Sequence, residues 1–115
     1  MLNMRLSKDA ECLLCVLYNE YLIRRKKGIP DNDAVLFGGS DAIQDEYLPQ
    51  LSVEGVDKAA GELKDFGFLK CSYGDNMVSY CCLLPNAITH IERIFDTKPD
   101  QLPQHIETLL TFISG

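Results

Sequence analysis

Two clusters of side chains in the first quarter of the chain have types and spacing that could do chemistry. Cys12 and Cys15 are separated by two residues, the spacing of many metal-binding knuckles and thiol redox motifs. The second cluster is an unbroken basic run, Arg24, Arg25, Lys26 and Lys27. Its cations could clamp phosphates or an acidic protein surface. Both clusters also have a structural interpretation, which depends on the elements that hold them.

The cysteines are expected to be small buried apolar residues. Cys12 and Cys15 lie inside an apolar helical pattern, which lacks the strand-to-helix setting of a redox pair and the second ligand pair of a zinc site. Cys81 and Cys82 are adjacent on an expected strand, so their side chains point to opposite faces, and Cys71 could face Cys81 across a hairpin. We therefore expect reduced thiols, no metal site and no cofactor.

No arrangement of residues typical of catalysis is recognisable. His90 and His105 are the only histidines, and both fall at surface or flanking positions of expected helices. Gly38-Gly39 precedes a helix but lacks the preceding strand and the following lysine of a phosphate-binding loop. No serine or cysteine occupies a nucleophile elbow. The sequence therefore predicts a non-enzymatic protein.

Length, composition and charge describe one ordinary globular domain over residues 1–115. The chain is 46% hydrophobic and 24% charged, and no run approaches the roughly 18 apolar residues of a membrane span. The first nine residues lack a signal-type apolar block, so we expect a cytoplasmic location. The net charge is −6, and residues 31–115 carry five cations against fourteen carboxylates. That balance opposes binding to nucleic acid.

The first expected helix covers residues 8–27. Ser7 is its N-cap, and Gly28 and Pro30 end it. The basic run then lies in the last turn, where each cation stabilises the helix dipole by about 0.3–1 kcal/mol. Apolar residues surround nearly the whole helix, so either the rest of the domain or a second subunit must cover it from more than one direction.

A loop is expected over residues 29–40, followed by a short helix over 42–48 that Ser40 or Asp41 caps. Ser52 caps the next helix, over 53–66, which Gly67 closes. This helix has the cleanest amphipathic pattern in the chain. Its apolar arc consists of Val53, Val56, Ala59, Ala60, Leu63 and Phe66.

Two strands are expected over residues 68–73 and 77–83, because the turn-forming residues Gly74-Asp75-Asn76 separate them. A helix follows from Pro85 to about Asp96, then a linker over 97–101 and a last helix with Pro103 in its first turn. The apolar residues of these two helices are Ile88, Ile91, Ile94 and Phe95, and Ile106, Leu109, Leu110, Phe112 and Ile113. The apolar tail helix around Ile106 to Ile113 and the apolar first helix together predict a homodimer in which residues 96–115 form a dimerisation element.

This order of elements over residues 8–95 resembles the winged helix-turn-helix fold, and small prokaryotic or prophage-type members look similar overall. The segment 51–70 carries the resemblance, with Leu63, Gly67, Phe68 and Leu69 as the entry into the wing. The resemblance implies an α+β domain with a three-helix core and a β-hairpin wing, to which the sequence adds two extra C-terminal helices. It also implies a role in transcription regulation, with the helix over 53–66 inserted into the major groove of double-stranded DNA.

Candidate DNA-binding residues follow from that resemblance and from charge. They are Ser52, Lys58, Lys64 and Lys70, together with Arg24, Arg25, Lys26 and Lys27 as the main source of affinity. The wing tip has no cation, and the candidate recognition helix lacks the Arg, Asn and Gln that read bases. Gly61 is the one glycine in the middle of its polar face, either an imperfection or a point of close approach by a partner.

Charge on the same helix favours an alternative function. Its polar face carries Glu54, Asp57, Glu62 and Asp65 against Lys58 and Lys64. The spacing of Lys58 from Glu54 and from Glu62 predicts a solvated, self-paired face. The alternative to DNA binding is therefore a winged-helix protein–protein interaction module that binds no nucleic acid.

Overall fold

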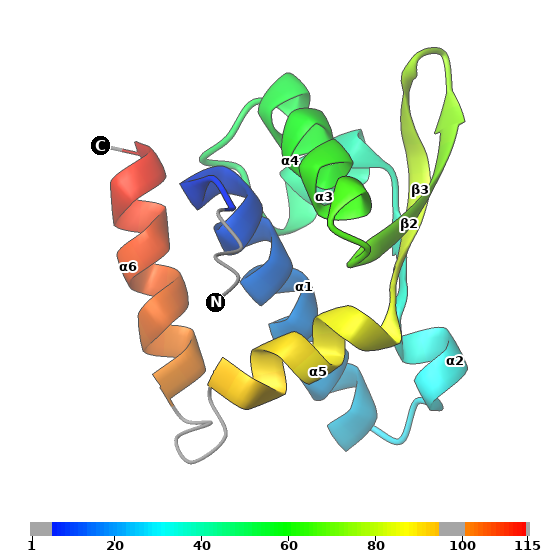
Figure 1. Ribbon diagram of the computed structural model, residues 1–115, viewed down its shortest axis with the longest axis vertical. Helices are drawn as coiled ribbons and strands as arrows, with labels where there is room; N and C mark the ends of the chain where they lie inside the picture. Colours follow the sequence, from blue (N-terminus) through cyan, green and yellow to red (C-terminus); the bar gives the residue numbers. More distant parts are fainter. Residues whose placement is uncertain (1–5, 95–100, 115) are drawn as a thin grey trace.

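The structure, a computed structural model, describes residues 6–94 and 101–114. In these ranges the chain is an α+β fold of six helices and one small antiparallel sheet (Figure 1). The elements are α1 (Lys8–Lys26), α2 (Asp31–Ala34), β1 (Leu36–Gly38), α3 (Ser40–Glu46), α4 (Val53–Asp65), β2 (Leu69–Gly74), β3 (Met77–Leu83), α5 (Pro85–Ile94) and α6 (Leu102–Ser114). The expected helix end near Asp96, with Phe95, and the linker over 97–100 lie outside the described residues, as does the side chain of Phe112.

Helix α1 is the centre of the core. It begins as the sequence predicts, because the hydroxyl of Ser7 accepts a hydrogen bond from the backbone N–H of Ala10 at 3.1 Å. Every residue from Cys12 to Tyr18 is buried, and α4, α5 and α6 surround the helix (Figure 1). The domain itself therefore covers the apolar surface of α1.

Helix α6 packs along α1 and buries Leu102 and Leu109. The imidazole Nε2 of His105 lies 3.1 Å from the carboxylate of Glu11, which adds a polar contact between the two helices. The apolar surfaces that predict a homodimer thus pack against each other within one chain. The homodimer loses this supporting argument and stays an untested prediction.

The expectation of a loop over residues 29–40 is wrong in part, because the structure has α2 and β1 there. Strand β1 pairs with β3, with Phe37 opposite Cys81, and the sheet order is β1-β3-β2. Three residues are too few to show an alternating pattern, and β1 is a strand only because β3 offers it an edge. A Cβ on Gly39 would lie 2.6 Å from the carbonyl oxygen of Val78, so only glycine permits this close approach.

Helix α3 begins at Ser40, two residues before its expected start, with Gly39 as N-cap and no capping side chain. Helix α4 agrees with expectation, since the hydroxyl of Ser52 accepts a hydrogen bond from the N–H of Gly55 at 3.0 Å. Val56 and Leu63 of α4 are fully buried against the core. The expected apolar arc of α4 is wrong at Phe66, because this residue is 37% exposed.

Strands β2 and β3 form the expected hairpin, with β2 displaced by one residue. Asp75 and Asn76 both have positive φ, 53° and 64°, the backbone that tight hairpin turns require. Cys71 lies directly opposite Cys81, because a register shift between Ser72 and Tyr73 moves the pairing by one residue from the one that the turn at Asp75-Asn76 would give. Beyond the hairpin, α5 buries Ile91, whereas Ile94, expected on the same apolar face, is 57% exposed.

Candidate functional site

The candidate site is the surface formed by α3, α4 and the β2–β3 hairpin, which we call the α3–α4 face. These elements lie together at one end of the molecule, with the hairpin projecting beside α4 (Figure 1). Together these elements carry eight carboxylates and three lysines, a net charge of −5. They are Asp41, Asp45, Glu46, Glu54, Asp57, Glu62, Asp65 and Asp75, and Lys58, Lys64 and Lys70.

Asp57 joins the three parts of this face. Its Oδ1 accepts hydrogen bonds from the hydroxyl of Ser40, at 2.7 Å, and from the backbone N–H of Val78, at 2.8 Å. Ser40 begins α3 and is fully buried, and Val78 lies in β3. One carboxylate of α4 therefore holds both the preceding helix and the hairpin in place.

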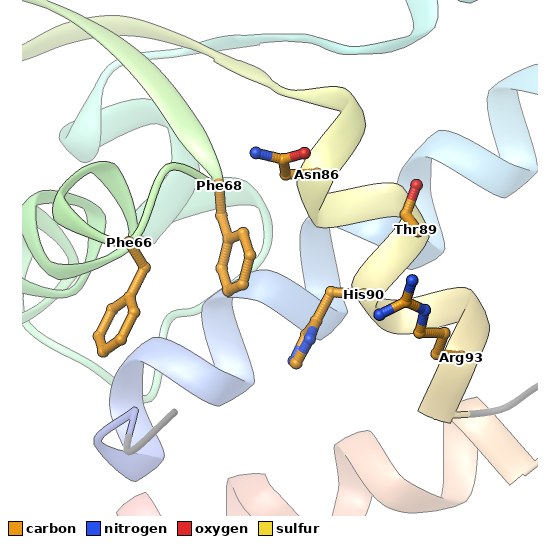
Figure 2. Close-up of a pocket in the computed structure, with 6 residues that line it drawn as sticks. All are labelled: Phe66, Phe68, Asn86, Thr89, His90 and Arg93. Carbon is orange, nitrogen blue, oxygen red and sulfur yellow. The ribbon is translucent and has the colours of Figure 1, made fainter. Parts of the chain in front are cut away.

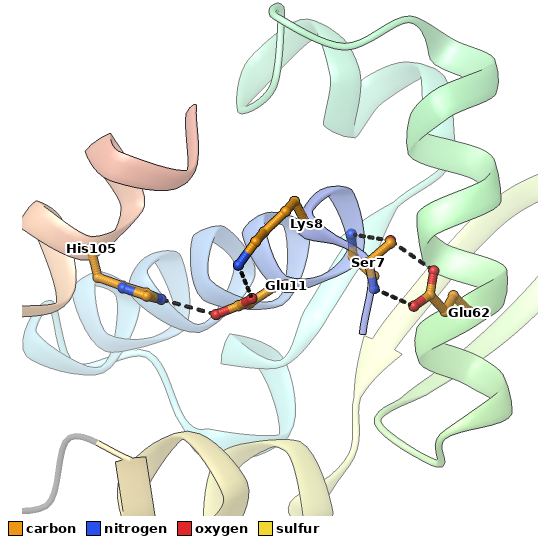
Figure 3. A network of polar contacts seen from close by, with 6 residues as sticks. Ser7, Lys8, Glu11, Glu62 and His105 are labelled. Atoms are coloured by element: carbon orange, nitrogen blue, oxygen red, sulfur yellow. Dashed lines mark hydrogen bonds and ion pairs between the residues drawn. The ribbon is translucent and has the colours of Figure 1, made fainter. Parts of the chain in front are cut away.

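Glu62, on the other side of α4, holds a further element against this helix (Figure 3). Its carboxylate accepts hydrogen bonds from the backbone N–H and from the hydroxyl of Ser7, at 2.7 and 2.8 Å. Because Ser7 is also the N-cap of α1, this contact connects the beginning of α1 to the last turn of α4. Two of the four carboxylates on the polar side of α4 thus have structural partners.

The sequence predicts that Lys58 pairs with carboxylates on the same helix, and this prediction is wrong. No ion pair joins Lys58 to Glu54 or Glu62, all of which are described, and Lys58 is exposed. Glu62 instead turns toward Ser7. Lys64 is also exposed, and its ammonium lies 4.9 Å from the centre of the Tyr73 ring in the hairpin, a cation–π contact.

The basic run divides into a structural pair and an exposed pair. Arg24 forms an ion pair with Glu20 at 3.1 Å, donates to the carbonyls of Ala34 and Leu36, and stacks over Phe37 at 4.4 Å. Arg25 forms an ion pair with Asp31 at 2.7 Å and donates to the carbonyl of Ile29. Lys26 and Lys27 are exposed in the same turn. Both arginines thus have partners within the chain, Arg24 half-buried and Arg25 in an exposed ion pair.

The predicted DNA-binding residues do not gather into one surface. The last turn of α1, with the basic run, lies at the end of the molecule opposite the hairpin turn (Figure 1). Ser52 uses its hydroxyl to cap α4. Lys70 lies on β2, opposite Cys82 of β3. Lys58 and Lys64 are thus separated from the run that was to supply most of the affinity.

The cysteines are free thiols, and Cys12, Cys15 and Cys81 are buried as expected. Burial raises the pKa of Cys12 to about 11 and those of Cys15 and Cys81 to about 12. Cys71 and Cys82 are half-buried, and burial raises their pKa values also. The raised pKa values favour the protonated thiols near neutral pH, which makes them poor nucleophiles.

Sequence reasoning missed the roles of Asp57 and Glu62. Both residues have the spacing of a solvated helix face, and nothing local to α4 distinguishes them from Glu54 or Asp65. Their partners lie 21 and 55 residues away in the chain, at Val78 and Ser7. Only the packing of α4 between α1 and the hairpin brings these groups together.

Comparisons of the chain with protein-family models, curated proteins and solved structures found no match. Among residues 6–94 and 101–114, no group of three or more His, Cys, Asp or Glu side chains could hold a metal ion. In the same ranges no helix has both the length and the apolar character needed to cross a membrane.

Proposed function

We propose that this chain is a winged-helix domain that binds a basic segment of a partner protein through the α3–α4 face. Three features support the winged-helix part: the antiparallel sheet order β1-β3-β2, the helix pair α3–α4, and the hairpin that follows α4. In this arrangement α4 takes the position of the recognition helix and the hairpin that of the wing.

The net charge of −5 on α3, α4 and the hairpin carries the choice of partner. DNA binding depends on cations that neutralise phosphates, and an acidic surface repels the duplex instead. A lysine- or arginine-rich segment is attracted by the same surface, and such complementarity accelerates association and aligns the partners. The sign of the charge thus favours a basic protein segment over nucleic acid.

Several of these carboxylates are available to a partner. Asp45 and Glu46 on α3, and Glu54 and Asp65 on α4, are exposed, and none of them forms an ion pair with another described residue. Carboxylates in solvent bind arginine in a bidentate geometry without first breaking an internal contact. These four side chains are the proposed contacts for the basic segment.

Double-stranded DNA is the second candidate partner, and the element order is the observation that favours it. In this alternative Lys58, Lys64 and Lys70 would contact the duplex, and the protein would act in transcription regulation. Two observations oppose DNA binding. Carboxylates accompany those lysines on the same elements, and the basic run lies at the other end of the molecule.

Fluorescence anisotropy of the full chain at 50 mM salt distinguishes the two candidates. The probes are a labelled peptide with alternating arginine and glycine and a labelled duplex of about 20 base pairs. We expect the peptide to bind with a Kd below about 100 μM and to weaken as salt rises to 200 mM, because salt screens such contacts. We expect no duplex binding below about 10 μM.

Charge-reversal variants locate the contact. The double substitution Asp45→Lys and Glu46→Lys should weaken peptide binding at least tenfold. Glu107→Lys, on the exposed side of α6, is the matched control. It should change the affinity for the peptide less than twofold. Equal effects of both changes, or duplex binding below 10 μM that Lys58→Glu abolishes, would contradict the proposal.

A further inference from the structure

A surface pocket of about 300 Å³ lies between the end of α4, the start of β2 and one side of α5 (Figure 2). Three of the four carboxylates proposed to bind a partner lie away from its lining residues in the chain, on α3 and at the start of α4, and the fourth, Asp65, directly precedes the lining residue Phe66. The pocket's lining residues are Phe66, Phe68, Asn86, Thr89, His90 and Arg93. Aromatic rings and polar groups therefore share one small surface.

One wall of the pocket consists of three rings in a row (Figure 2). The ring of Phe68 stacks on the imidazole of His90, with centroids 4.9 Å apart, and on the ring of Phe66 at 6.2 Å. Phe68 is buried, whereas Phe66 is partly exposed. An exposed phenyl ring costs free energy in water, and a flat apolar ligand would cover it.

The other wall is polar and comes from α5. Asn86, Thr89 and Arg93 follow one another at intervals of three or four residues, so they share a helix face. None of these side chains, nor that of His90, forms a hydrogen bond or ion pair with another described residue. Burial and the nearby Arg93 lower the pKa of His90, so its imidazole is neutral at pH 7. Arg93 is then the one charged group of the lining.

We propose that this pocket binds a small aromatic carboxylate. The ligand's ring packs against Phe66 and Phe68, and its carboxylate accepts hydrogen bonds from the Arg93 guanidinium. Asn86 and Thr89 line the same pocket beside Arg93. The proposal needs neither partner peptide nor DNA, so it stands or fails independently of the function proposed above.

Size and charge select this class of ligand. A water molecule occupies about 30 Å³ in the liquid, so a pocket of 300 Å³ has room for roughly ten non-hydrogen atoms. One six-membered ring with a carboxylate has nine. A neutral aromatic molecule would leave Arg93 without a counter-charge, and a simple anion such as acetate would leave Phe66 uncovered. Both are therefore suitable negative probes.

Titration of the ¹⁵N-labelled full chain, followed by amide NMR shifts, tests the proposal directly. Benzoate should shift amides of residues 66–68 and 86–93 and saturate with a Kd of about 1 mM or below, a realistic affinity for so small a ligand. Benzyl alcohol and acetate, as the two negative probes, should bind at least tenfold more weakly. Absence of saturable shifts up to 10 mM benzoate, or equal binding of benzoate and benzyl alcohol, would overturn it.

Two variants and a control assign the contacts. Arg93→Gln should weaken the binding of benzoate at least tenfold and leave the binding of benzyl alcohol unchanged. Phe66→Ala should weaken the binding of both ligands. Lys58→Gln removes a cation from the exposed side of α4 and should leave benzoate binding within twofold. Arg93 and Phe66 are both exposed, so both variants should fold. Thermal unfolding of each variant is the check. Unchanged benzoate affinity in folded Arg93→Gln would refute the assigned geometry.

Discussion

The carboxylate of Asp57 in α4 lies 2.8 Å from the backbone nitrogen of Val78 in β3, and the hydroxyl of Ser40 lies 2.7 Å from the same oxygen. This contact connects the first residue of α3, the middle of α4 and the hairpin. The N–H of Val78 and the hydroxyl of Ser40 both have little access to water, since each residue is buried. Asp57 thus determines how the hairpin lies beside α4.

Asp57→Ala should lower the free energy of unfolding by about 1.5–3 kcal/mol, because hydrogen bonds to a charged group are lost and two buried donors are left without an acceptor. Urea unfolding followed by circular dichroism measures the change. Asp65→Ala, at an exposed position of the same helix, is the control and should stay within about 0.5 kcal/mol of the wild type. Similar losses in both variants would show that Asp57 has no special role.

Arg24→Met should destabilise the fold by about 1–3 kcal/mol. The guanidinium joins the end of α1 to the carbonyls of Ala34 and Leu36, and methionine preserves the apolar stem but none of those hydrogen bonds. Lys26→Met, two residues away and exposed, should change stability by less than about 0.5 kcal/mol. Chemical denaturation of the two variants compares them directly, and a larger effect of Lys26→Met would contradict the structural role of Arg24.

Two glycine-to-alanine substitutions should change stability in opposite directions. A Cβ on Gly39 would lie 2.6 Å from the Val78 carbonyl oxygen and 2.9 Å from that of Ser79, so Gly39→Ala must displace β3 and destabilise the fold. A Cβ on Gly61 would meet nothing within 4 Å, and alanine in the middle of α4 should stabilise it by about 0.5–1 kcal/mol. Thermal unfolding gives both signs.

Gly61→Ala also tests the two interpretations of that glycine. If Gly61 is a tolerated imperfection, the stabilised variant binds the basic peptide with unchanged affinity. If a partner approaches the backbone closely there, the added methyl group weakens binding while the domain remains more stable. The anisotropy assay distinguishes these outcomes.

The five thiols should react with a disulfide reagent in two kinetic groups. Cys71 and Cys82 are half-buried and should react first, whereas Cys12, Cys15 and Cys81 are buried and should react only as the domain opens. The pKa of Cys15, raised to about 12 by burial, leaves almost no thiolate at pH 8. Labelling followed by mass spectrometry counts the groups. Fast labelling of Cys15 in the native protein would contradict its burial.

Much of the fold could be predicted because its elements begin and end at local signals. Ser7 and Ser52 mark helix starts through their hydroxyls, and Asp75 and Asn76 accept the positive φ of the hairpin turn. Each signal acts within about four residues, so a single sequence contains all of the relevant chemistry. The burial of Val56 and Leu63 follows equally from helical periodicity.

Contacts between distant residues needed the tertiary structure. Strand β1 exists because β3 pairs with Leu36–Gly38, and the chain alone shows no strand pattern there. Phe66 follows the apolar spacing of α4, yet it is the C-cap residue of the helix, is 37% exposed and lines the surface pocket.

The same distinction holds for charge. The sequence by itself determined that the chain is acidic and that four of its eleven cations form one run near the end of the first helix. Which charges act in the fold and which face solvent was decided by packing, as Arg24 and Glu62 show. A local pattern specifies the face of a helix, whereas the partner on that face comes from another part of the chain, and only the folded arrangement brings the two together.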